Sequence, residues 1–209
     1  QVYIVFYCNA TGSNVRGSEF ANIFGRCGTV DYDDVMALTE IVTDKPYDDE
    51  NRLGVTGGSY GGYITNWIIG HNEVFKAAVS KRSVGSWLTS LLTCEGGFPL
   101  VEDQLSGMPV WHDKSWQKLW DDSPVKYADK VKTPTLFIHS DEDYNTWLVE
   151  GLMMYTALIY HNVETKMHIF KGESHGLSRN GKPSHRIRRV EEILQWFEQH
   201  LKEDANENI

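Results

Sequence analysis

The stretch Leu53-Gly54-Val55-Thr56-Gly57-Gly58-Ser59-Tyr60-Gly61-Gly62 decides the fold. The apolar run from Leu53 to Thr56 predicts a short strand, and apolar residues with a period of about 3.6 between Tyr63 and Ile68 predict a helix after it. Between them lies a G-x-S-x-G pattern, in which small residues flank a serine on a sharp turn because a Cβ there would collide with neighbouring backbone. We therefore expect Ser59 to stand exposed above a sheet.

Composition and charge narrow the class of protein. The 209 residues are 41% hydrophobic and 12% aromatic, which is enough for residues 1–209 to form one domain with a substantial core. The formal charge of −9 and the pI near 5.3 would repel phosphate backbones. No run reaches the roughly 18 to 20 apolar residues of a transmembrane helix. We therefore expect a soluble protein with neither nucleic acid nor a membrane as a partner.

The three cysteines give no sign of a disulfide framework or a zinc site. Cys8, Cys27 and Cys94 are odd in number, widely spaced and without a CxxC pair. This usage is typical of a reducing compartment, so we expect a cytoplasmic location.

Strand-like and helix-like segments alternate along the chain, which predicts an α/β fold with a mostly parallel sheet covered by helices. The expected strands are Val2 to Tyr7, Leu53 to Thr56, Phe75 to Ser80, Thr135 to His139 and Thr165 to Phe170.

Two of the expected helices carry most of the remaining pattern. A helix that contains Val35, Leu38, Ile41 and Val42 begins with three acids, which we interpret as dipole and capping residues rather than catalysts. These acids are Asp31, Asp33 and Asp34. The last helix is expected to pack on the sheet through a stripe formed by Ile187, Val190, Leu194, Phe197 and Leu201.

The segment from Ser86 to Val131 breaks the alternation. It is rich in tryptophan and interrupted by glycine and proline, so we expect loops and short helices over the edge of the sheet, where such excursions line substrate pockets. For each single tryptophan, packing beneath a long loop is the simpler interpretation.

A serine nucleophile needs a base, and His175 is the best candidate. The carboxyl ends of parallel strands share one edge of the sheet, and both His175 and the cluster Asp141-Glu142-Asp143 follow predicted strands. The order serine, acid, histidine is that of α/β-hydrolases, and His139 is the one rival base. Spacing leaves Asp141, Glu142 and Asp143 as competing orienting carboxylates.

Four stretches carry a resemblance to a known family. They are Arg52 to Tyr63, Ser123 to Tyr127, Lys132 to Tyr144 and Gly172 to Arg179. Together they resemble the catalytic domain of the prolyl oligopeptidase family of serine peptidases, and most closely its acylaminoacyl-peptidase-like branch. The resemblance covers nearly the whole chain and implies the α/β-hydrolase fold.

The resemblance also implies roles for individual residues. In the family, the acid of the triad stands two residues before a usual arginine, and Asp143 stands two before Asn145, so the implied triad is Ser59, Asp143 and His175. The backbone N–H of Tyr60 is implied as an oxyanion-hole donor. This chemistry requires neither a metal nor an organic cofactor.

The chain also departs from the family pattern. Asn145-Thr146-Trp147 stands where the family shows Arg-Cys-Pro or Arg-Val-Pro, which removes a cationic anchor for substrate, and Asn9 to Ser13 replaces an Asn-Pro-Arg-Gly-Ser pattern. The family's His-Gly-Gly-Pro segment, which resembles the second oxyanion donor, and its β-propeller are absent. We therefore expect the C-terminal part of a longer protein that lacks the first strands of its sheet, with a complementing N-terminal segment or a second copy at the exposed edge.

Three functions from different classes follow. The leading hypothesis is a serine peptidase that hydrolyses short or N-acylated peptides through an acyl-enzyme. An esterase for small acyl esters is the alternative within enzymes, because the same triad cleaves both bonds. The third is a catalytically incomplete fragment with a binding or assembly role.

Overall fold

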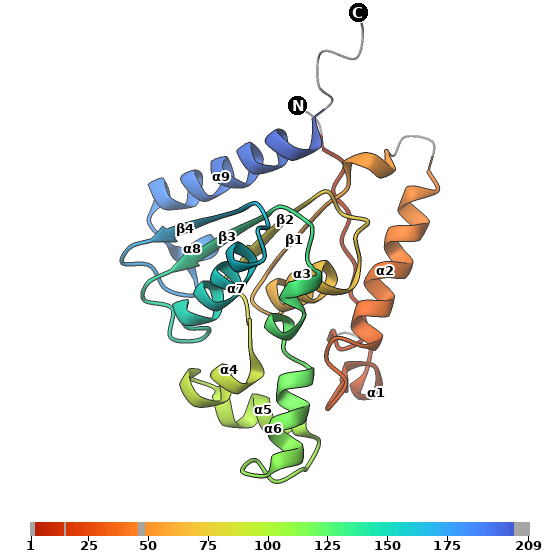
Figure 1. The fold of residues 1–209 in the computed structure, drawn as a ribbon, viewed down its shortest axis with the longest axis vertical. Coiled ribbons are helices and arrows are strands. Elements are labelled where there is room, and N and C mark those ends of the chain that lie inside the picture. Colours follow the sequence, from red (N-terminus) through yellow and green to blue (C-terminus); the bar gives the residue numbers. More distant parts are fainter. Residues whose placement is uncertain (1–2, 15, 46–48, 203–209) are drawn as a thin grey trace, which may run out of the picture.

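A single parallel sheet forms the centre of the molecule (Figure 1). The computed structural model describes residues 3–14, 16–45 and 49–202. Its four described strands lie in the order β1-β2-β3-β4, and every neighbouring pair is parallel. The bounds are Gly54–Gly58 for β1, Ala77–Lys81 for β2, Thr135–Ser140 for β3 and Thr165–Phe170 for β4. The α/β class and four of the five predicted strands are confirmed.

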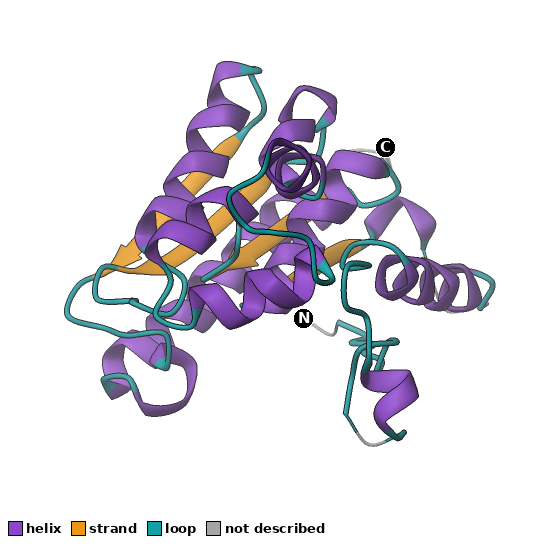
Figure 2. Cartoon of the chain, turned by 90° about the horizontal axis from the view of Figure 1, so that it is seen from below, coloured by secondary structure: helices purple, strands orange, loops and turns teal. Residues whose placement is uncertain are grey.

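Helices lie on both sides of this sheet (Figure 2). The α-helices are α1 Ser18–Ala21, α2 Val30–Thr43, α3 Tyr60–His71, α4 Trp87–Thr93, α5 Gly97–Leu105, α6 Asp113–Asp121, α7 Leu148–Tyr160, α8 Leu177–Asn180 and α9 Pro183–Leu201, and the 3₁₀-helices are η1 Glu50–Arg52 and η2 Pro124–Lys130. In the described part of the chain, none of them is both long enough and apolar enough to cross a bilayer.

Alternation along the strands divides the core into two layers. Leu136 and Ile138 point to one face and pack with Trp196 of α9. Phe137 points to the other face and packs with Met154 of α7. Successive side chains of a strand point to opposite sides of its sheet, so the central strands are covered on both faces and their carboxyl ends are left at a common edge.

The segment from Ser86 to Val131 forms α4, α5, α6 and η2, which extend away from the sheet (Figure 1). The predicted excursion of loops and short helices is therefore confirmed. Trp87 is fully buried and packs edge-on against Tyr63 with 5.2 Å between ring centroids, whereas Trp111 is 63% exposed. Core packing is thus the role of the first tryptophan but not of the second.

The predicted buried strand from Val2 to Tyr7 is wrong over its described part. Val2 lies outside the described residues, and residues 3–7 are exposed and join no ladder; Val5 is 77% exposed. A strand is defined by hydrogen bonds to a neighbour, and β1, at one end of the described sheet, pairs only with β2. The apolar composition is that of a strand, but no described segment lies in position to pair with it.

The predicted contact face of α9 is also wrong in part. Ile187, Val190 and Leu194 are 43 to 61% exposed. The helix instead buries Trp196 and Glu192, the latter through bonds to Lys166 and Arg188 at the sheet surface. The buried face is therefore rotated relative to the most apolar stripe.

Candidate active site

The nucleophile elbow lies where β1 passes into α3. Ser59 has φ 61° and ψ −122°, and its N–H donates to the carbonyl of Lys81 at 3.0 Å. A Cβ on Gly57 would lie 2.9 Å from the Cα of Gly61 and closer still to its carbonyl, whereas a Cβ on Gly61 would meet nothing within 4 Å. The expected steric need for small residues therefore holds for Gly57 and is wrong for Gly61.

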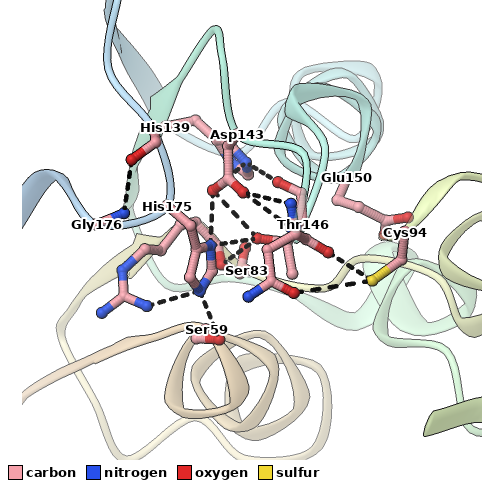
Figure 3. Close-up of polar contacts among 12 residues, drawn as sticks. Ser59, Ser83, Cys94, His139, Asp143, Thr146, Glu150, His175 and Gly176 are labelled. Carbon is pink, nitrogen blue, oxygen red and sulfur yellow. Dashed lines mark hydrogen bonds and ion pairs between the residues drawn. The ribbon is translucent and has the colours of Figure 1, made fainter. Parts of the chain in front are cut away.

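Three loops bring a serine, a histidine and an aspartate together (Figure 3). The Nε2 of His175 lies 2.9 Å from the Oγ of Ser59, and its Nδ1 lies 2.8 Å from Oδ2 of Asp143. Ser59 follows β1, Asp143 follows β3 and His175 follows β4. The common edge expected for parallel strands thus places these side chains in hydrogen-bond contact.

Asp143 differs from its acidic neighbours in its burial. Its side chain is 1% exposed, and Oδ1 accepts the N–H of Asn145 at 3.1 Å and that of Thr146 at 2.9 Å. Asp141 and Glu142 are exposed, and Asp141 accepts the N–H of Gly172 instead. Of the three competing carboxylates, only Asp143 contacts the histidine.

The rival base His139 is turned away from the serine. Its ring is buried, and its Nε2 lies 2.8 Å from the carbonyl of Thr146, to which Nε2–H donates. Burial lowers the pKa of His139 below its usual value, with the Thr146 carbonyl opposing the shift. A neutral imidazole that supports the loop of Asp143 fits these contacts.

Two further residues touch the histidine and were not predicted. The Oγ1 of Thr146 lies 3.2 Å from Nδ1 of His175 and donates to the carbonyl of Arg82 at 2.9 Å. The guanidinium of Arg82 lies 2.9 Å from Nε2 of His175. The available signal was positional, since Arg82 directly follows β2 and so ends at the same edge.

Tyr60 occupies the first position of α3, where a backbone N–H has no acceptor within its own helix. Its phenol donates to Oδ2 of Asp31 at 2.6 Å, and Asp31 is 2% exposed. Burial raises the pKa of the Tyr60 phenol far above its usual value, so the group remains a donor. This contact ties α2 to the elbow.

The acids at the start of α2 do not cap it. The helix begins after Thr29 without a side-chain cap, and Asp31 is engaged by Tyr60. Asp34 instead accepts the N–H and the hydroxyl of Thr11, both at 2.7 Å. Capping was therefore wrong for these two side chains, although acids in a first turn still complement the helix dipole.

A model of the prolyl oligopeptidase family matches residues 1–204. The chain belongs to the prolyl oligopeptidase family. Within the described ranges, no three His, Cys, Asp or Glu side chains are grouped as a metal site requires.

Relatives and solved structures agree with this assignment. A Bacillus subtilis protein described as uncharacterized peptidase YuxL is 43% identical over 203 residues, which are 95% of this chain and 30% of that protein. The acylaminoacyl peptidase of Pyrococcus horikoshii is similar in fold, with a TM-score of 0.87 and 34% identity over 95% of this chain and 32% of that one. An acylaminoacyl peptidase in complex with Z-Gly-Gly-Phe-chloromethyl ketone has a TM-score of 0.85 at 35% identity, over 95% of this chain and 32% of its own. The chain thus has the α/β-hydrolase fold and spans about a third or less of these proteins.

Proposed function

We propose that this chain carries the catalytic machinery of a serine peptidase that hydrolyses short or N-acylated peptides. The observation that supports the proposal best is the continuous relay from Ser59 Oγ to His175 Nε2 at 2.9 Å, and from His175 Nδ1 to Asp143 Oδ2 at 2.8 Å. Membership of a peptidase family adds to it. In this proposal residues 1–209 are the catalytic domain of a longer protein.

The relay supplies each step of acyl transfer. The Oγ of Ser59 attacks the substrate carbonyl while its proton passes to Nε2 of His175, and the imidazolium then gives that proton to the departing amine. Asp143 accepts the Nδ1–H and stabilises the imidazolium. Its own charge is held by two backbone N–H donors. Water activated by His175 then hydrolyses the acyl-enzyme.

The oxyanion of the tetrahedral intermediate needs fixed donors. We assign one donor to the N–H of Tyr60, because it follows the nucleophile at the start of α3 and the side chain is fixed by Asp31. A typical oxyanion hole has two donors. In this proposal the second comes from a segment upstream in the full-length protein, which also covers β1 at its unpaired edge.

The substrate class follows from the relatives. Proteins of similar fold are named acylaminoacyl peptidases, and one is bound to a peptide chloromethyl ketone. A peptide is therefore the proposed substrate of this site. The free thiols of Cys8, Cys27 and Cys94 favour a reducing, cytoplasmic location, and burial raises the pKa of Cys27 to about 11, which keeps that thiol unreactive.

Labelling with a fluorophosphonate probe tests the assignment. We expect the wild-type chain to be labelled and Ser59→Ala to be unlabelled. Ser174→Ala is the matched control, because Ser174 adjoins His175 but is exposed and bonds only locally to the N–H of Gly176. An unlabelled wild type, or a Ser59→Ala variant labelled as fast as wild type, would contradict the proposal.

A further inference from the structure

A small cavity beside the nucleophile is basic although the chain as a whole is acidic. The cavity has a volume of about 80 Å³, and Gly58, Lys81, Arg82 and Arg189 contribute to its wall, which includes no carboxylate. The net charge of the chain is −9. A concentration of positive charge against that background suggests a site for an anion.

Arg82 presents its guanidinium from a fixed backbone. Its φ is 40°, its N–H donates to the carbonyl of Ile138 at 2.8 Å, and its own carbonyl accepts the hydroxyl of Thr146 at 2.9 Å. The guanidinium lies against Gly58, where a Cβ would come within 3.3 Å of Nη2. The side chain is therefore aimed along the edge of the sheet toward His175.

The positive charge of Arg82 has no ion-pair partner among the described residues. The acid that influences it is Asp143, whose oxygens are already engaged by His175 and by two backbone N–H groups. Around it, burial and repulsion from Arg189 and Arg82 lower the pKa of Lys81 to about 8. An anionic group in the cavity would relieve this repulsion.

Two donors compete for one acceptor on the histidine. A neutral imidazole Nε2 has a single lone pair, and both the guanidinium of Arg82 and the hydroxyl of Ser59 lie 2.9 Å from it. General-base catalysis requires that this lone pair face Ser59. In the working complex the N–H of Arg82 needs another acceptor, and a bound anion would provide it.

We propose that Arg82 binds the α-carboxylate of the residue on the leaving side of the scissile bond, so that the enzyme favours release of a C-terminal amino acid. The inference rests on the proposed peptidase function. The leaving nitrogen takes its proton from Nε2 and so passes within hydrogen-bond distance of it. Its own α-carboxylate is separated from that nitrogen by one carbon atom, which places the carboxylate within reach of a guanidinium 2.9 Å from Nε2. Arginine and carboxylate also match in their forked geometry.

A pair of substrates tests the proposal in the full chain. Two N-acetylated dipeptides are compared that differ only in ending with a free carboxylate or a carboxamide. We expect wild type to prefer the free acid by about ten- to a hundredfold in kcat/KM, and Arg82→Gln to reduce the ratio to near one. Using the ratio cancels any general effect of the substitution on His175. Equal rates on both peptides, or an unchanged ratio in Arg82→Gln, would overturn the inference.

A matched control and a binding measurement complete the test. Arg179→Gln removes an exposed charge that repels Arg82 without contacting His175, and it should leave the ratio within about twofold. Calorimetry on the Ser59→Ala chain measures the affinities for both peptides without turnover, and the same preference for the free acid is expected. Preferential binding without hydrolysis in wild type would sink the peptidase proposal but uphold the carboxylate site, whereas equal binding of both peptides would sink the site.

Discussion

Gly57 is the position where the elbow tolerates no side chain. In Gly57→Ala the new Cβ would lie 2.9 Å from the Cα of Gly61, against 3.4 Å for ordinary contact, and nearer still to its carbonyl. The obstacle is backbone rather than a flexible side chain, so β1 and α3 must separate by at least about 0.5 Å. We expect a loss of about 3 kcal/mol in the free energy of unfolding. Because a displacement of this order at a nucleophile is costly, fluorophosphonate labelling should slow by about ten- to a hundredfold.

Gly61→Ala is the natural control for this prediction, because it adds the same methyl group to the same motif in open space. Relief of glycine's backbone freedom within α3 should stabilise it by about 0.5 to 1 kcal/mol, with labelling close to wild type. Urea unfolding followed by tryptophan fluorescence and the labelling time course measure both quantities. If Gly57→Ala were as stable and as quickly labelled as Gly61→Ala, the steric account of the elbow would be refuted.

Three other substitutions test separate contacts. Asp143→Asn keeps an oxygen for the two backbone donors, so the fold should survive while turnover of an acyl-peptide substrate falls by about 10⁴-fold; near-normal turnover would contradict the role of Asp143. Burial raises the pKa of Glu150 from 4.5 to about 7, so between these pH values the folded chain binds a proton that the unfolded chain has released. Relative to Glu150→Gln, wild type should therefore lose roughly 2 to 3 kcal/mol of unfolding free energy as the pH rises from 4.5 to 7, and parallel urea-derived stability curves would refute this. Tyr60→Phe leaves the buried carboxylate of Asp31 without its phenol donor and should cost about 1 to 3 kcal/mol in urea unfolding, whereas an unchanged midpoint would show that Asp31 finds another partner.

The approach of the three loops was predictable because it depends on topology. Strands that alternate with helices run parallel, and residues just after their ends meet at one edge; Ser59, Asp143 and His175 all stand there. Spacing could not choose among neighbouring acids, since the deciding difference is burial. Asp141 remains exposed and accepts a loop N–H.

Other features depend on tertiary contacts that leave little trace in a local pattern. Arg82 reaches His175 because its backbone turns to a φ of 40° after β2, a conformation rare for residues with side chains. On α9, Glu192 is 2% exposed because Lys166 and Arg188 bind its carboxylate. A search for apolar periodicity places a glutamate outside and so rotates the helix to the wrong face.

The backbone of Ser59 links reactivity to assembly of the fold. Its φ of 61° and ψ of −122° cost about 1 to 3 kcal/mol, and they are maintained by bonds from Ser59 to the Lys81 carbonyl and from Tyr63 to the Ser59 carbonyl. These partners exist only after β2 and α3 have docked on β1. A nascent or thermally loosened chain therefore carries an ordinary, inert serine, and the extent of covalent labelling would count the properly folded molecules in a sample.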